Sequence, residues 1–290
     1  MGLPVDIRSL RSYSHGMNTN YGASEERLAH YTCFRAPGPI RVDGRLDEEA
    51  WQAAPFSPPF VDLVTGAPAP LDTRVACLWD DRALYVAFRV AEPHVRATLT
   101  RRDSFVWNDN DVEVFIAGDD CYYEFEINAL GTVYEALFVW QDALRPGGRF
   151  DAPEYDPRRR DVDLLGGFQD ASRFGRHPRG KRWAFLDWDL QGLEAAVHVD
   201  GPINDPSRAG TGWTVELAFP WPGLGPLFAG RPLPPREGDV LRVDFSRFEP
   251  LGDPARKPAP GWCLNAHGVY DSHIPECFSF VHFSGRAAGR

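Results

Sequence analysis

The sequence predicts an all-β fold, an antiparallel β-sandwich of the immunoglobulin or jelly-roll type with a few short helices. Three observations support this fold class. Short segments alternate apolar and polar residues, they are rich in β-branched and aromatic side chains, and turn signals separate them at short intervals. The 290 residues are enough for one such domain with a large core, and no internal repeat is present.

The start of the chain differs from the rest in composition and in hydrophobic pattern. Residues 1–30 are polar and lack periodicity, which predicts a flexible N-terminal tail, whereas residues 31–290 are predicted to form a single β-sandwich. Residues 40–44 are predicted to form a short strand that ends in an Asp-Gly turn. Residues 46–54 are predicted to form a short helix, which Pro55 ends.

Strands then follow one another along the chain. Residues 73–79 and 84–90 both alternate, and the intervening Asp80-Asp81 turn predicts a hairpin. A short helix is expected near Leu224. The remaining predicted strands cover residues 111–116, 122–128, 132–140, 194–199, 213–219, 239–248 and 278–283.

Residues 141–182 interrupt this pattern. Pro, Gly and Arg dominate the segment, which contains the run Arg158-Arg159-Arg160. Long segments of this kind are often mobile or functional, so we predict one partly ordered loop insertion. The arginine run is more typical of a solvated face than of a phosphate site.

Charge and hydropathy limit the classes of partner. The net charge is −10 and the sequence pI is about 5.3, which argues against nucleic acid and against an anionic membrane surface. No apolar run approaches the length of a membrane span. Residues 1–14 lack the apolar core of a signal peptide, so the chain as written is expected in the cytoplasm. The oligomeric state is not predicted.

The five cysteines form no Cys-x-x-Cys pair and no Cys/His zinc spacing. Their odd number leaves at least one thiol unpaired in a monomer. Reduced, buried thiols are the favoured interpretation, and one disulfide remains an alternative.

The stretch from residue 107 to residue 135 carries the strongest functional signal. The period of two in a strand places Val112, Val114 and Ile116 on one face, which should be core. The opposite face of residues 111–116 and 122–128 then carries polar side chains. These are Glu113, Glu124, Glu126 and Asn128, with Trp107 at the entrance to the first strand.

An aromatic ring beside carboxylates and an amide suits sugar binding. The C–H face of a pyranose can lie on an indole, and its hydroxyls donate hydrogen bonds to ionised acceptors, which make the stronger bonds. The alternative is that this is merely the solvated polar face of an antiparallel sheet. The residues alone leave both interpretations open.

An ordered set of segments resembles the family 9 carbohydrate-binding modules, β-sandwiches of the DOMON-like superfamily. The resemblance runs from about residue 38 to residue 284. The matching segments are Ile40-Arg-Val-Asp-Gly-Arg-Leu-Asp-Glu-Glu-Ala-Trp51, Trp79-Asp-Asp-Arg-Ala-Leu-Tyr-Val-Ala-Phe88, Trp107-Asn-Asp-Asn-Asp-Val-Glu-Val-Phe-Ile116, Tyr123-Glu-Phe-Glu-Ile-Asn-Ala-Leu-Gly131, Gly212-Trp-Thr-Val-Glu-Leu-Ala-Phe-Pro-Trp221 and His273-Ile-Pro-Glu-Cys-Phe278.

The resemblance implies non-catalytic binding of a saccharide or polysaccharide in a context of carbohydrate degradation, and an extracellular or periplasmic location. It places the stacking ring at Trp107 and polar contacts at Glu113 and Asn128. The chain departs from the family pattern at Glu126, where some members have Arg, and near His273, where sugar-clamping members carry a second Trp. The full predicted ligand-binding set is Trp107, Glu113, Glu124, Glu126, Asn128 and His273.

No cofactor is expected, although the resemblance makes a structural calcium ion an option. Oxygen donors for calcium occur in turns at Asp80, Asp81, Asp109, Asp111, Asp119 and Asp120. Nothing matches the twelve-residue calcium loop, and turn-forming aspartate is the favoured interpretation. His267 and His273 lack zinc-site spacing, and the only methionines lie in the tail, which disfavours a Met/His haem pair.

Two other functions stay open. A glycoside hydrolase needs two carboxyl groups at a set separation, which Glu113, Glu126 and Glu135 could supply. A module that recognises a protein or another small ligand could use the same face. No nucleophile-elbow, phosphate-loop or dinucleotide-binding motif occurs.

Overall fold

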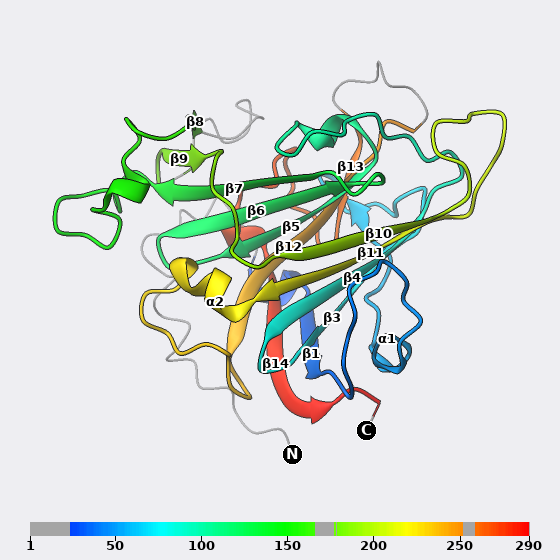
Figure 1. Cartoon of the computed structure of the whole chain (residues 1–290), viewed down its shortest axis with the longest axis horizontal. Helices are drawn as coiled ribbons and strands as arrows, with labels where there is room; N and C mark the ends of the chain where they lie inside the picture. The colour runs from blue at the N-terminus through cyan, green and yellow to red at the C-terminus, as the bar shows by residue number, and fades with distance from the viewer. Residues whose placement is uncertain (1–23, 166–176, 178, 252–258, 290) are drawn as a thin grey trace.

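The computed structural model describes residues 24–165, 177, 179–251 and 259–289, and it confirms the all-β sandwich (Figure 1). The helical elements are short. They are α1 (Glu49–Ala53), α2 (Trp221–Leu224) and the 3-10 turns η2 (Glu25–Arg27), η3 (Val106–Asn108), η4 (Pro153–Tyr155), η5 (Gly225–Leu227) and η6 (Pro275–Cys277). The strands are β1 (His30–Arg35), β2 (Val61–Asp62), β3 (Thr73–Trp79), β4 (Ala83–Ala91), β5 (Asp111–Ala117), β6 (Cys121–Asn128), β7 (Val133–Trp140), β8 (Val162–Leu165), β9 (Arg182–Phe185), β10 (Glu194–Asp200), β11 (Gly212–Pro220), β12 (Val240–Phe248), β13 (Gly261–Cys263) and β14 (Ser279–Ala287).

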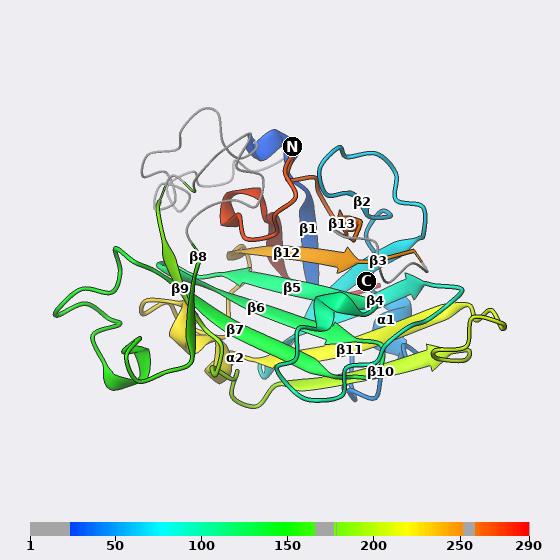
Figure 2. The same ribbon diagram turned by 90° about the horizontal axis from the view of Figure 1, so that it is seen from above.

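The strands form one continuous path of hydrogen-bonded neighbours that folds over on itself. Its order is β10-β11-β4-β3-β1-β14-β12-β5-β6-β7-β9-β8. Strand β1 pairs in parallel with both β3 and β14, so it joins the layer of β3, β4, β11 and β10 to the layer of β12, β5, β6 and β7 (Figures 1 and 2). The other pairs of the path are antiparallel.

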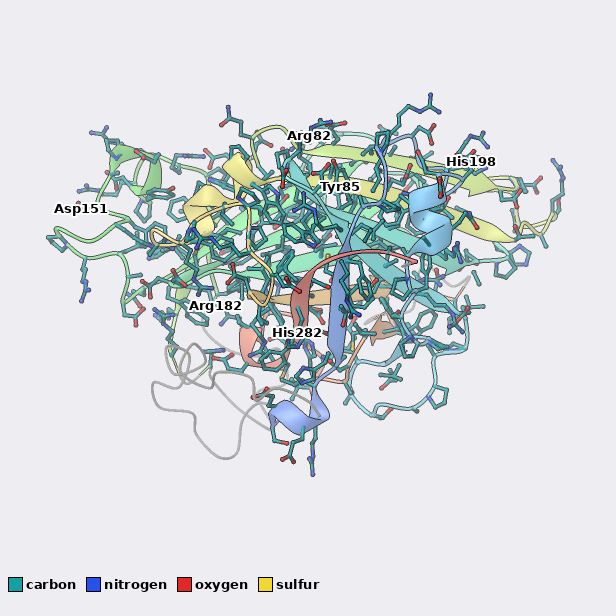
Figure 3. The ribbon with its side chains drawn as sticks, turned by 90° about the horizontal axis from the view of Figure 1, so that it is seen from below. Arg82, Tyr85, Asp151, Arg182, His198 and His282 are labelled. Carbon is teal, nitrogen blue, oxygen red and sulfur yellow. The ribbon has the colours of Figure 1, made fainter. Side chains whose placement is uncertain are left out.

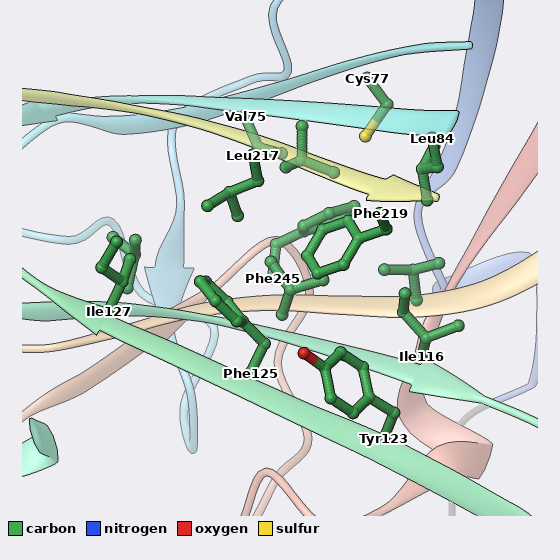
Figure 4. Packing of buried hydrophobic residues seen from close by; sticks show 14 of the residues in the cluster. Val75, Cys77, Leu84, Ile116, Tyr123, Phe125, Ile127, Leu217, Phe219 and Phe245 are labelled. Carbon is green, nitrogen blue, oxygen red and sulfur yellow. The ribbon is translucent and has the colours of Figure 1, made fainter. Parts of the chain in front are cut away.

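The main core lies between the two layers. Val75, Leu84 and Leu217 contribute from one layer, and Ile116 and Phe125 contribute from the other, all fully buried (Figure 4). The alternation read from these strands is confirmed, because every second residue faces this core. Burying such side chains gives about 1.5–3 kcal/mol each, which makes this the main source of stability.

The segment before α1 is not the strand that the sequence predicts for residues 40–44. Glu216 of β11 accepts hydrogen bonds from the backbone N–H of Asp43 at 2.9 Å and of Gly44 at 2.7 Å. The same carboxylate accepts the indole N–H of Trp51 at 2.5 Å. Gly44 has a φ of 85°, and a Cβ there would lie 2.5 Å from the carbonyl carbon of Val197. Backbone donors that bond a side chain are unavailable for a sheet ladder.

Other differences between the predicted and the observed strands arise because a strand forms only where a pairing partner is present, and that partner can lie far away in sequence. Residues 162–165, predicted as loop within the insertion, form β8 because β9 supplies their hydrogen bonds. Strands β1, β2, β9 and β13 were not predicted. Of the predicted tail, only residues 24–30 are described, and there Glu25–Arg27 form a 3-10 turn and His30 begins β1.

Two further observations concern the cysteines and the possibility of a membrane span. All five cysteines are free and buried. Among the described residues, no helix has the length and apolar character needed to span a bilayer.

Candidate functional site

The predicted polar face exists on the outer side of β5 and β6, away from the main core. Glu113 lies directly opposite Glu126 in the register of β5 with β6, and Phe115 lies opposite Glu124. Strand β12 adds Ser246, which lies opposite Glu113. Because side chains alternate along a strand, the three glutamates share one face.

This face is buried rather than solvated. The exposed fraction is 3% for Glu113, 3% for Glu124 and 2% for Glu126. The segment that leads into β14 lies over it, since His267 contacts Asp244 of β12 at 3.4 Å and His273 contacts Glu124 of β6 at 3.5 Å (Figure 2). The interpretation as an ordinary solvated sheet face is therefore wrong.

Three carboxylates converge at one end of this face. One ligand oxygen from each of Asp111, Glu113 and Glu126 lies within 4.8 Å of the others. Glu113 accepts a hydrogen bond from the hydroxyl of Ser246 at 2.7 Å, and Asp111 accepts one from the backbone N–H of Phe248 at 3.1 Å. Burial raises the pKa of Glu113 to about 8 and also raises the pKa values of Asp111 and Glu126.

A second polar chain runs from Glu124 to Arg182. His273 contacts Glu124 through Nε2 and the hydroxyl of Tyr122 through Nδ1, the latter at 3.2 Å. Arg182, labelled in Figure 3, donates to the Tyr122 hydroxyl at 2.8 Å and to the backbone carbonyl of His273 at 3.1 Å. Burial lowers the pKa of His273 to about 4 and raises the pKa of Glu124, so both partners are held uncharged at neutral pH.

This chain predicts a loss of stability in acid that depends on His273. The unfolded imidazole takes up a proton near pH 6.5, whereas the buried one resists protonation down to about pH 4. Stability is thus fully present above pH 6.5 and falls as the pH drops towards 4. We expect His273→Gln to reduce this fall by about 1–2 kcal/mol in urea titrations at neutral and acidic pH. The exposed His94, changed to Gln, is the control, and an unchanged slope in His273→Gln would contradict the prediction.

Both the amide nitrogen and the amide oxygen of Asn128 form hydrogen bonds within the chain. Its amide nitrogen donates to the carbonyl of Leu99 at 2.8 Å and to Asp109 at 3.0 Å. Its amide oxygen accepts the backbone N–H groups of Leu130 at 3.0 Å and Thr132 at 2.9 Å. In this structure Asn128 closes the turn after β6, and a sugar contact would have to replace one of these bonds.

Trp107 lies at the edge of the same face within a small aromatic group. It is half-buried, stacks on Phe105 at 4.5 Å between ring centroids, and meets Tyr134 edge-on at 5.3 Å. Phe105 has 53% of its surface exposed. Tyr134 of β7 lies opposite Glu126 of β6, which connects the rings to the carboxylates. We term Phe105, Trp107 and Tyr134 the aromatic group.

Sequence reasoning missed Phe105 and Tyr134. Phe105 stands two residues before Trp107, and Tyr134 occupies an outward position of β7, so the alternation of β7 could have identified Tyr134. Glu135, considered as a catalytic acid, lies on the core side opposite Phe125 and accepts from the backbone N–H of Leu190 at 3.0 Å. It is therefore separated from Glu113 and Glu126 by the sheet.

Most of the turn aspartates considered for calcium bond to groups of the chain itself. Asp80 accepts backbone N–H groups of its own turn, and Asp109 accepts those of Thr98 and Leu99. Asp81, Asp119 and Asp120 each pair with an arginine. Asp111 differs, because it belongs to the carboxylate trio.

The comparisons with known proteins agree with this architecture. Residues 67–146 match carbohydrate-binding family 9. A carbohydrate-binding role has been ascribed to a Bacteroides uniformis protein whose structure has a TM-score of 0.57 with this chain at 14% identity, covering 88% of this chain and 99% of that one. A family 9 module from Caldicellulosiruptor kristjanssonii in complex with glucose has a TM-score of 0.50 at 14% identity, covering 88% and 96%. A comparison with curated proteins finds no match.

The matched segment contains β3 to β7 and, with them, the aromatic group and the carboxylate trio. The two structural similarities are too distant in sequence to show more than the fold. The resemblance read from the sequence is confirmed: across residues 67–146 this chain carries the pattern of carbohydrate-binding family 9.

Proposed function

We propose that the protein binds a carbohydrate non-covalently at the outer face of β5, β6 and β7, without catalysing its cleavage. The observation that carries the proposal is the aromatic group at the edge of a polar face, within the segment that matches family 9. A sugar offers an apolar C–H face to such rings, and large rigid rings give contact area at little entropic cost.

The aromatic contact is the primary part of the proposal. The sugar ring stacks on the surface made by Trp107 and Phe105, of which Phe105 is the more exposed. The finer part assigns hydrogen bonds with sugar hydroxyls to Glu113, Glu124, Glu126, Asn128 and His273. Their burial means that a sugar must displace internal contacts to reach them, so they are tested separately from the rings.

The first test is titration calorimetry with glucose and short glucose oligomers. We expect Trp107→Ala and Phe105→Ala each to weaken binding about tenfold or more, because a central aromatic contact is often worth 2 kcal/mol or more. Phe56→Ala is the matched control, since Phe56 packs with the cluster on the outer face of β3 and β4. The proposal would be overturned if the wild type bound no saccharide, or if both ring variants bound saccharide with the affinity of the wild type.

The second test concerns the polar contacts. Glu124→Gln keeps the size of the side chain and replaces its carboxyl group by an amide. Weaker binding in this variant supports direct recognition by the carboxyl group. Unchanged binding, with loss only in the ring variants, would remove the finer part and leave the aromatic contact in place.

A further inference from the structure

Two histidines that are 252 positions apart in the sequence meet at the surface of the sheet. His30 lies on β1 and His282 on β14, and these strands pair in parallel with Thr32 opposite His282. Nδ1 of His30 lies 2.8 Å from Nε2 of His282. His30 is exposed and His282, labelled in Figure 3, is partly buried, so ions in solution can reach both. We term these two residues the histidine pair; neither belongs to the set proposed to contact sugar.

The surroundings of the histidine pair hold its rings in place. The ring of His30 stacks flat on that of Phe280 of β14, with 4.7 Å between centroids and an interplanar angle of 8°. The rings of His30 and His282 lie 5.1 Å apart at an angle of 19°. Strand β1 also pairs with β3 on its other side. The two nitrogens are therefore brought together by the sheet before any ligand arrives.

The hydrogen bonds around the pair indicate which nitrogens carry protons. Nε2 of His30 lies 3.4 Å from the backbone carbonyl of Glu25, which can only accept, so the proton of a neutral His30 lies on Nε2 and its Nδ1 presents a lone pair. Nε2 of His282 then donates to that lone pair. Metal-binding histidines almost always donate their second N–H to such a group, because this bond fixes the tautomer and the ring orientation.

His282 can offer a second lone pair at neutral pH. Burial and the neighbouring His30 lower the pKa of His282, against a smaller opposing effect of the Glu25 carboxylate. The imidazole is therefore neutral at pH 7. Its Nε2 becomes a ligand nitrogen when the proton moves to Nδ1, the other tautomer of the neutral ring.

We propose that His30 and His282 form a two-histidine site for a divalent transition metal of tetragonal geometry, Cu²⁺ or Ni²⁺. Imidazole nitrogen is a ligand that suits both metals. Two nitrogens at about 2.0–2.1 Å from a metal are about 2.9 Å apart at a right angle and about 3.3 Å apart in a tetrahedron. The 2.8 Å separation in the pair matches the right angle. A small rotation of the rings turns both lone pairs towards the metal, and water or the Glu25 carboxylate fills the other positions.

The test titrates full-length protein with CuCl₂, NiCl₂ or ZnCl₂ in a calorimeter, with glycine as a weak competing chelator and without saccharide. We expect one tight equivalent of Cu²⁺ per chain, and a melting temperature higher by about 5 °C or more when free Cu²⁺ is about 100 times Kd. His30→Gln and His282→Gln should each weaken this binding at least tenfold. Electron paramagnetic resonance of the Cu²⁺-loaded protein should show a tetragonal spectrum with two imidazole nitrogens, and each variant should lose that signal.

Three comparisons separate a metal site from two histidines that only share a hydrogen bond. His94→Gln is the matched control, since His94 is exposed on the loop after β4, and it should bind Cu²⁺ as the wild type does. Without metal, both pair variants should melt within about 2 °C of the wild type, because the changes lie at the surface. No tight equivalent in the wild type, or its retention in both pair variants, would overturn the inference. Zn²⁺ bound more tightly than Ni²⁺ would overturn the tetragonal assignment. Saccharide plays no part in these titrations, so this inference and the proposed sugar binding can fail separately.

Discussion

Replacing Arg247 by Met is expected to lower the free energy of unfolding by about 3–5 kcal/mol, the largest single effect that we predict. The guanidinium is fully buried on β12 and donates to Glu92 at 2.8 Å and to Glu249 at 3.2 Å. It also donates to the hydroxyl of Thr73 at 2.9 Å and to the carbonyl of Ala91 at 3.0 Å. Its loss leaves two carboxylates buried without their cation.

The position of Arg247 explains why its replacement should lower the free energy of unfolding of the whole domain. Its partners belong to β3 and to the end of β4, so the side chain ties the two layers together. The guanidinium also lies over the ring of Trp262, 4.9 Å from its centroid. Urea denaturation measures the effect.

Two further variants make this experiment decisive. Arg74→Met removes an exposed pair with Asp72 and should cost about 0.5 kcal/mol or less. The triple change of Arg247→Met with Glu92→Gln and Glu249→Gln removes the stranded charges and should recover part of the loss. A cost below about 1 kcal/mol for Arg247→Met alone would refute this account.

Replacing Glu216 by Ala is expected to lower the free energy of unfolding by about 3 kcal/mol, the second largest effect. Three donors, the backbone N–H groups of Asp43 and Gly44 and the indole of Trp51, would lose their acceptor at once. Each buried donor left unsatisfied costs about 1–3 kcal/mol, with some relief where water enters.

The same experiment tests whether Glu216 anchors the segment of residues 43–51 to β11. Glu216→Gln retains one carbonyl oxygen and should cost less than Glu216→Ala. Glu194→Ala, at an exposed position of β10, should stay within about 0.5 kcal/mol of the wild type. Protection of the Trp51 indole against hydrogen exchange should fall in Glu216→Ala. Full protection together with unchanged stability would show that Glu216 is not the anchor.

The site was partly predictable because strand alternation is a local property. The period of two in residues 111–116 and 122–128 correctly placed the glutamates on one face, away from the core. Burial of that face was not predictable, because it depends on a segment more than 130 residues later in the chain, where His267 contacts Asp244 and His273 contacts Glu124. The same contacts turn expected solvent-facing acids into groups with raised pKa values.

The class of fold, most of the strands, and the side of the sheet on which Trp107 and the glutamates lie could be inferred from the sequence, because these follow from patterns over a few residues. Three contacts could be seen only in the folded chain: β1 joins the two layers, Glu216 holds the Asp-Gly turn, and Asp111 meets Glu113 and Glu126. These contacts depend on strand order and register, which bring distant residues together. The identity of a polar residue in the sequence does not reveal whether its partner in the folded chain is water, a group on another strand or a cation.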